Sequence, residues 1–97
     1  KRRSNNTAVF DGDKLSLPLT VRSRKEGDKI SLKGFCGTKK LSDIFTDEKI
    51  ERHLRDSIPI VEKDGEILFV CGIRQSSLYE PDENTKNYLI IKYERKC

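Results

Sequence analysis

The apolar residues of this 97-residue chain change their spacing once, and that change limits the fold. Over residues 15–21 they occupy every second position, which is the pattern of a half-buried strand. At Leu41, Ile44 and Phe45 they follow the i, i+3, i+4 spacing of one helix face. We therefore expect an α+β domain whose mainly antiparallel sheet forms a sandwich or partial barrel, with two short helices inserted between strands.

Turn signals divide the rest of the chain into short strands. Lys-Asp-Gly-Glu at residues 63–66 stands between two apolar runs and predicts a β-hairpin. Pro18 indicates an edge strand or a bulge, and it shares the expected outward face with Arg22 and Arg24. Leu41, Ile44 and Phe45 are predicted to be buried. The remaining strands are expected at residues 9–10, 29–32, 60–62, 67–71 and 88–93.

A second helix is predicted from an N-cap at Asp47 to about Arg55, before the Pro at position 59. Its apolar stripe would consist of Ile50 and Leu54. The face away from this stripe would carry basic side chains, namely Lys49, Arg52 and His53.

Length and composition indicate one small domain at residues 8–97, preceded by a linker or flexible end at residues 1–7. No apolar run reaches the roughly 20 residues that span a bilayer, so we expect no membrane partner. The sequence contains no Met, which indicates a processed chain or a piece of a longer one. Its three widely spaced cysteines favour a reducing, cytoplasmic location over a disulfide framework.

Groups able to perform catalysis are scarce. Cys36 and His53 could in principle form a nucleophile–base pair, but no local signature supports it. There is no G-x-x-x-x-G-K phosphate loop, and one His without a paired-cysteine motif argues against a zinc site. We expect no catalytic residue, no metal and no cofactor in this chain.

Positive charge is concentrated between residues 20 and 55, where ten Lys and Arg face six Asp and Glu. Such clustering indicates a polyanionic partner. Gly34-x-x-Gly37 and the adjacent Lys39 and Lys40 suit a phosphate, because glycine loops expose backbone N–H groups. A KH fold is disfavoured, since its GXXG loop joins two helices and a strand precedes the loop here. Few aromatic residues lie nearby, which favours a folded or double-stranded backbone over single-stranded bases.

An ordered series of motifs carries a family resemblance: V-R-x-R-x-x-G-D-x-I at residues 21–30, G-x-x-G-x-K-K-L-x-D-x-F-x-x-x-K-I at 34–50, then I-P, D-G-E-I and V-x-G-I-R. Across residues 19–93 the chain resembles the C-terminal domain of bacterial tRNA(Ile)-lysidine synthetase. The S-G-G-x-D-S loop of that family's catalytic domain is absent from this sequence.

The resemblance implies a non-catalytic module, inactive alone, of a ligase that uses ATP and lysine to convert the wobble cytidine of an isoleucine tRNA to lysidine. Its partners would be that tRNA, gripped at the acceptor stem, and the N-terminal catalytic domain of the parent chain. The rival interpretation is a protein-interaction or dimerisation module with a basic face. In that case the strand at residues 67–70 or the strand at residues 88–93 would provide the sheet edge that binds the partner. The candidate RNA contacts on this basis are Arg22, Arg24, Lys39, Lys40, Lys49 and Arg52.

Overall fold

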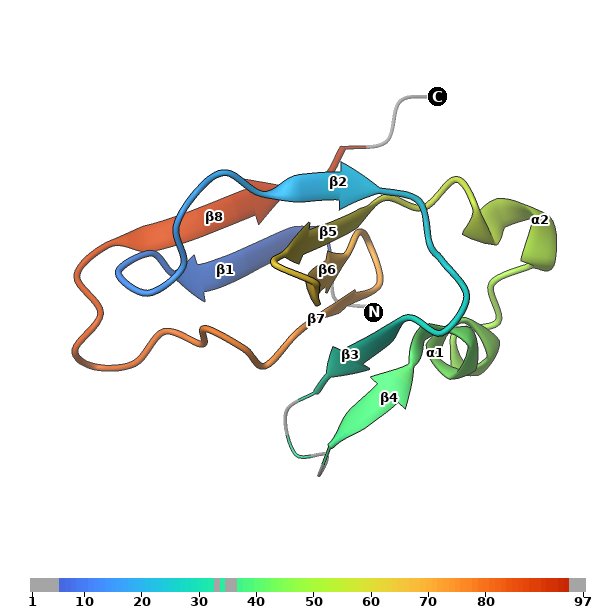
Figure 1. Ribbon diagram of the computed structural model, residues 1–97, viewed down its shortest axis with the longest axis horizontal. Coiled ribbons are helices and arrows are strands. Elements are labelled where there is room, and N and C mark those ends of the chain that lie inside the picture. The colour runs from blue at the N-terminus through green and yellow to red at the C-terminus, as the bar shows by residue number, and fades with distance from the viewer. Residues whose placement is uncertain (1–5, 33, 35–36, 95–97) are drawn as a thin grey trace, which may run out of the picture.

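Three antiparallel sheets and two short helices make up the part of the chain that the computed structural model describes, which is residues 6–32, 34 and 37–94 (Figure 1). The central sheet has the strand order β2-β5-β6-β7, β1 pairs with β8, and β3 pairs with β4. The expected α+β class is confirmed, and the described strands do not close into a barrel. In chain order the elements are β1 (Thr7–Asp11), β2 (Thr20–Arg22), β3 (Lys29–Ser31), β4 (Thr38–Lys40), α1 (Leu41–Asp47), α2 (Arg52–Arg55), β5 (Ile60–Lys63), β6 (Glu66–Val70), β7 (Arg74–Gln75) and β8 (Tyr88–Lys92).

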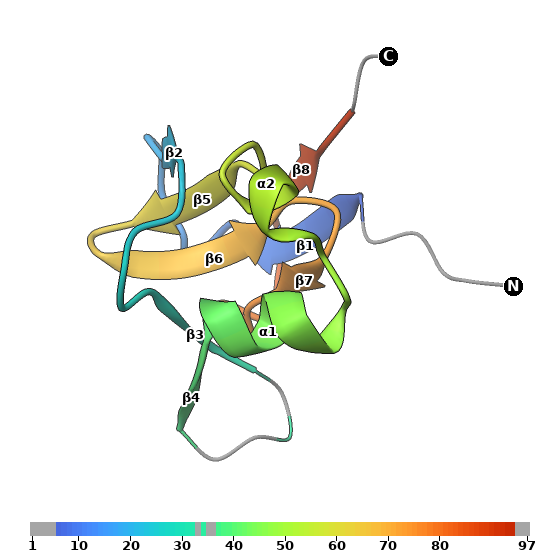
Figure 2. The ribbon, with the colours of Figure 1, turned by 90° about the vertical axis from the view of Figure 1, so that its right-hand side faces the viewer.

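The apolar run of β6 is continuous because both faces of the strand are buried. Ile67 and Val70 join a cluster formed with α1 and the β3–β4 hairpin, whereas Leu68 and Phe69 join a cluster formed with β1 and β8. Figure 2 shows α1 and the β3–β4 hairpin together on one side of β6. The central sheet is therefore the middle of three layers, with the hairpin and α1 outside one face.

The predicted hairpin at residues 60–71 is confirmed. Asp64 and Gly65 both have positive φ, at 52° and 87°, as a two-residue type I′ turn requires. The register of β5 against β6 shifts between Val61 and Glu62, so Leu68 has no partner residue on β5. This bulge explains why Leu68 and its neighbour Phe69 both contribute to the same cluster.

The expected strand at residues 15–21 is only partly correct, because β2 begins at Thr20. Leu15 is buried, but Leu17 and Val21 are 69% and 65% exposed, so the predicted inward face is wrong at these two positions. The reason is that β2 is the edge strand of the central sheet. Val21 faces the same side as its partner Val61, yet it is largely solvent-exposed.

Strand β4 is absent from the sequence prediction, which placed a loop at residues 34–37 and had the lysine pair open the helical insertion. Its sequence is Thr-Lys-Lys, and it offers no apolar alternation. It pairs with β3 in the register Lys29↔Lys40, Ile30↔Lys39 and Ser31↔Thr38. The strand after residues 26–28 therefore forms its hairpin with β4 rather than with β2.

Candidate nucleic-acid interface

Arg22 is predicted to face outward, and the structure places it between three segments instead. Its side chain is 16% exposed, and four of its five N–H donors are used. Nε donates to Glu62 at 2.6 Å, and the two Nη atoms donate to both carboxylate oxygens of Asp28 at 3.0 and 3.1 Å. Arg22 therefore connects β2, the 25–28 turn and β5, and it has little capacity left for a phosphate.

The same network stabilises the ionised form of Asp28. Partial burial on its own would raise the pKa of Asp28. The hydrogen bonds from Arg22 and from the backbone N–H of Lys25 outweigh that effect, so the pKa lies below its ordinary value. Asp28 is therefore ionised at neutral pH, and it shares the charge of Arg22 with Glu62.

Arg24 is partly engaged. Its Nε donates to Asp56 at 2.8 Å, and its guanidinium carbon lies 6.0 Å from the centre of the Phe45 ring. Arg55 approaches the same ring at 5.5 Å and donates to the carbonyl oxygen of Ile50. Contacts of this length to an aromatic ring stabilise by roughly 0.5–1 kcal/mol. In the described part of the chain the Nη atoms of Arg24 have no hydrogen bond, so they remain free to bind a partner.

Lys39 and Lys40 do not act as a pair, because neighbouring residues of a strand point to opposite faces. Lys39 lies on the face of β4 that carries its partner Ile30, and it forms an ion pair with Asp47. Lys40 lies on the other face, is exposed, and forms no ion pair with any described residue. The glycine loop itself is described only at Gly34 and Gly37, which both have positive φ, and Phe35 and Cys36 lie outside the described residues.

Lys29 is a basic residue that the sequence prediction missed. It stands directly opposite Lys40 in the β3–β4 register, so the two side chains share one face of the hairpin. Both are exposed, and the described residues provide no carboxylate for either. Only the register reveals this pair, since eleven positions separate the two lysines in the sequence.

The second helix begins later than predicted, because Asp47 ends α1 rather than capping α2. The N–H of Ile50 bonds to the carbonyl of Phe45, and the N–H of Lys49 bonds to that of Thr46. With Lys49 at φ 59°, this is the Schellman motif that ends many helices. Lys49 is therefore in the connection between α1 and α2, not on a helix face.

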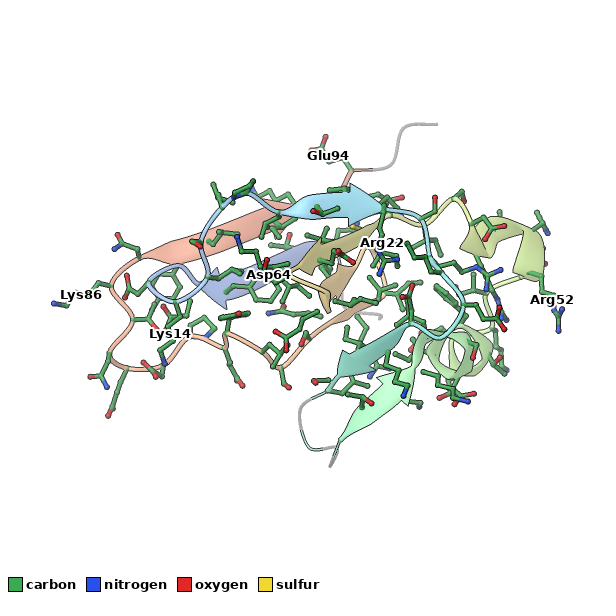
Figure 3. The ribbon with its side chains drawn as sticks, in the orientation of Figure 1. Lys14, Arg22, Arg52, Asp64, Lys86 and Glu94 are labelled. Carbon is green, nitrogen blue, oxygen red and sulfur yellow. The ribbon has the colours of Figure 1, made fainter. Side chains whose placement is uncertain are left out.

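Arg52 opens α2, and its side chain projects away from the rest of the molecule (Figure 3). No ion pair between Arg52 and another described residue is present. Leu54 of the expected apolar stripe is 37% exposed, whereas Ile50 is partly buried against the α1 cluster. Lys49 and Arg52 thus lie on a different segment from Lys29 and Lys40.

Groups suited to acid–base chemistry are not brought together in the described residues. His53 is exposed, with Nε2 3.5 Å from Glu51. Burial raises the pKa of the Cys71 thiol to about 11, which makes it a poor nucleophile. Among the described residues, no three His, Cys, Asp or Glu side chains are grouped closely enough to hold a metal ion. The same residues include no helix long and apolar enough to cross a bilayer.

Comparison with known proteins identifies the fold. The family described as the TilS substrate C-terminal domain matches residues 19–91. The chain belongs to this family. A solved crystal structure of a TilS C-terminal domain superposes with a TM-score of 0.80 at 41% identity, covering 99% of this chain and 76% of the other. The family resemblance read from the motifs is therefore confirmed.

Curated relatives place the TilS C-terminal domain within longer proteins. A tRNA(Ile)-lysidine synthase from Caldanaerobacter subterraneus is 45% identical over 87 residues, which covers 90% of this chain and 19% of the relative. A tRNA(Ile)-lysidine synthase from Geobacillus kaustophilus is 43% identical over 95 residues, which covers 97% of this chain and 20% of the relative. A bifunctional TilS/HprT protein from Listeria monocytogenes is 41% identical over a match that covers 93% of this chain and 14% of the relative. The chain spans about a fifth of the length of its lysidine synthase relatives.

Proposed function

We propose that this TilS C-terminal domain is the non-catalytic tRNA-binding part of a ligase that converts the wobble cytidine of an isoleucine tRNA to lysidine. In this proposal the domain grips the acceptor stem, while a catalytic domain of the same parent protein uses ATP and lysine. The domain itself would need no cofactor, and it would act in the cytoplasm. Family membership supports the assignment to the ligase, and the distribution of charge supports RNA binding.

The observation that carries the proposal is a set of cations without carboxylate partners between residues 25 and 52. Within the described residues, ion pairs occupy Arg22, Arg24 and Lys39. Five described cations of residues 25–52 have no such pair and lie on the β3–β4 hairpin, the preceding turn, the α1–α2 connection and the start of α2; Lys63, Lys86 and Lys92 elsewhere in the described chain also have none. Like charges gathered without counterions favour a polyanionic partner. The five cations of residues 25–52 are Lys25, Lys29, Lys40, Lys49 and Arg52.

Backbone contact is favoured over base stacking. Phe45, whose ring Arg24 and Arg55 approach, is completely buried. Tyr88 is 55% exposed, but it lies on β8 in the ribbon formed with β1, in another layer of the fold. Proteins that bind single strands need exposed aromatic platforms. A double-stranded RNA is instead recognised through phosphates and 2′-hydroxyls, which suits lysines and an acceptor stem.

The test compares RNA fragments with one another across a salt series. The 97-residue chain should bind tRNA with a steep dependence on salt, because each phosphate contact contributes roughly 0.7–0.9 to the slope of log K against log salt. An acceptor-stem minihelix should retain most of that affinity, and an anticodon stem-loop should lose it. Equal affinity for the two fragments would contradict acceptor-stem recognition, and no binding of tRNA would contradict the proposed function.

A dimerisation module remains the second candidate, on the evidence of one strand. Strand β8 pairs only with β1 among the described strands and carries Ile90 at 56% exposure. The other expected edge is wrong, since β6 lies between β5 and β7. Sedimentation equilibrium distinguishes the candidates, because association through β8 would raise the mass with concentration and Ile90→Lys would abolish the rise.

A further inference from the structure

Two neighbouring hollows lie beside the β3–β4 hairpin. The first, of about 360 Å³, is lined by Arg24, Lys25 and Lys40 together with the start of α1. The second, of about 380 Å³, is lined by Lys29 and by residues of the β5–β6 turn. Gly27 and Asp28 line both hollows, so the 25–28 turn is the wall between them.

The paired lysines of the hairpin connect these hollows. Lys40 lines the first hollow and Lys29 lines the second, yet the two residues are directly opposite in the strand register. Like charges directly opposite one another destabilise an antiparallel pair. The hairpin thus holds two ammonium groups on one face, each beside its own hollow, with no described carboxylate bonded to either. An anion in each hollow would remove the repulsion.

The two hollows together are lined by four cations and four carboxylates, and half of the carboxylates are bonded to arginines. Asp28 is bonded to Arg22, which it shares with Glu62, and Asp56 is bonded to Arg24. Glu26 in the first hollow and Glu66 in the second have no ion pair with described residues. Among the lining residues without an ion pair, Lys25, Lys29 and Lys40 outnumber the carboxylates by one, and Glu26 becomes a residue whose removal should favour an anion.

The turn between the hollows is open to a close approach. Gly27 has φ 87°, and a Cβ placed on it would meet no atom within 4 Å. The N–H of Asp28 bonds to the carbonyl of Lys25, and the N–H of Lys25 bonds to the Asp28 carboxylate, which fixes the turn from both ends. A rigid turn with free space over its glycine allows a nucleic-acid backbone to lie against the peptide.

We infer that this arrangement is a two-phosphate site, in which an RNA strand crosses the 25–28 turn with Lys40 beside one phosphate and Lys29 beside another. The identity of the polyanion rests on the proposed function. The site itself rests on the register, the two hollows and the unpaired lysines. It adds Lys29 and Lys25 to the binding surface, and it removes Lys39, which faces Asp47 on the other side of the hairpin.

Four versions of the 97-residue chain test the inference by tRNA binding across a salt series. Lys29→Gln with Lys40→Gln removes the pair, and Lys86→Gln with Lys92→Gln removes the same charge elsewhere. Lys86 lies at the opposite end of the molecule from α2 in Figure 3, and Lys92 lies on β8. The fourth version carries Glu26→Gln. Circular dichroism and thermal unfolding check that all four are folded.

The hairpin variant should bind roughly tenfold or more weakly, with a salt slope lower by about 1.4–1.8, the contribution of two phosphates. The control variant should stay within about twofold of the wild type, since its charges lie away from the site. Glu26→Gln should bind about two- to fivefold more tightly, because it removes a repulsive charge. A gain of affinity cannot result from damage to the fold.

The outcomes separate the two proposals. Wild-type binding with a steep salt slope, combined with equal losses in the hairpin and control variants, would overturn this site and leave tRNA binding intact. Unchanged tRNA affinity of Glu26→Gln, together with an unchanged salt slope of the hairpin variant, would also overturn this site and leave tRNA binding intact. Absence of tRNA binding by the wild type would overturn both the proposed function and the site.

Discussion

Strand β2 and the β3–β4 hairpin both carry basic residues, but they use them differently. The side chain of Arg22 in β2 is 16% exposed and forms ion pairs with Glu62 and Asp28, so its charge is paired within the domain. Lys29 and Lys40 of the hairpin are exposed and face each other without a described counterion. A count of basic residues cannot separate these cases. The comparison teaches that Arg22 holds segments of the domain together, whereas the ammonium groups of Lys29 and Lys40 remain available to a partner.

The largest expected effect comes from Phe45, which supports both regions. Its ring is completely buried and lies beneath the guanidiniums of Arg24 and Arg55. Phe45→Ala should lower the free energy of unfolding by about 3–5 kcal/mol, the cost of truncating a buried Phe. A denaturant titration measures this change. A loss below about 1 kcal/mol would show that the α1 cluster is not a tightly packed core.

Replacing one arginine or one lysine tests the comparison directly. Arg22→Met should lower the free energy of unfolding by about 1.5–3 kcal/mol, since it leaves Asp28 and Glu62 without their charged donor. Lys40→Met should change it by less than about 0.5 kcal/mol, as is usual for an exposed residue. Equal costs in urea titrations of the two variants would show that the two kinds of cation do not differ in the free protein.

Acid should weaken the arginine network specifically. The folded pKa of Asp28 lies below its ordinary value, so its stabilising contribution is present above the unfolded pKa of about 3.9 and is lost as the pH falls through the folded value. The unfolding free energy of the wild type should therefore fall more steeply below about pH 4 than that of Asp28→Asn. Glu83→Gln, in an exposed loop, is the charge-matched control. Parallel curves for the wild type and Asp28→Asn would contradict the role given to Asp28.

The difference between the two regions also shows what sequence can predict. The 60–71 hairpin and the buried face of α1 follow from local spacing and from an Asp-Gly turn, and both were correctly expected. The bond of Arg24 to Asp56 joins residues 32 positions apart, and the pairing of Lys29 with Lys40 depends on a register that no apolar alternation fixes. The availability of each cation was therefore invisible in the sequence, although the basic region as a whole was not.

Lys49, another cation without an ion pair to a described residue, has a left-handed backbone conformation that lowers stability. It takes φ 59° at the end of α1, a position where glycine is usual. Lys49→Gly should raise the unfolding free energy by about 1 kcal/mol, because a left-handed conformation costs a residue with a Cβ about that much or more. Lys25→Gly, at an exposed turn residue without a positive φ, is the control and should give no such gain. A loss of stability in Lys49→Gly would mean that its side chain supports the fold.

The smallest expected effect is the most direct test of the hairpin lysines. Lys29→Thr should raise the unfolding free energy of the free protein by about 0.2–0.5 kcal/mol more than the same change at Lys92 does. Both substitutions place Thr on an exposed strand position, so the gain in strand propensity is shared. Lys92 stands opposite Thr7, however, and only Lys29 stands opposite another lysine. The excess gain should shrink at high salt, which screens the repulsion between exposed charges. Equal gains at the two positions in low-salt urea titrations would show that the lysine pair is not repelled, and the electrostatic reason for an anion at the hairpin would then be lost.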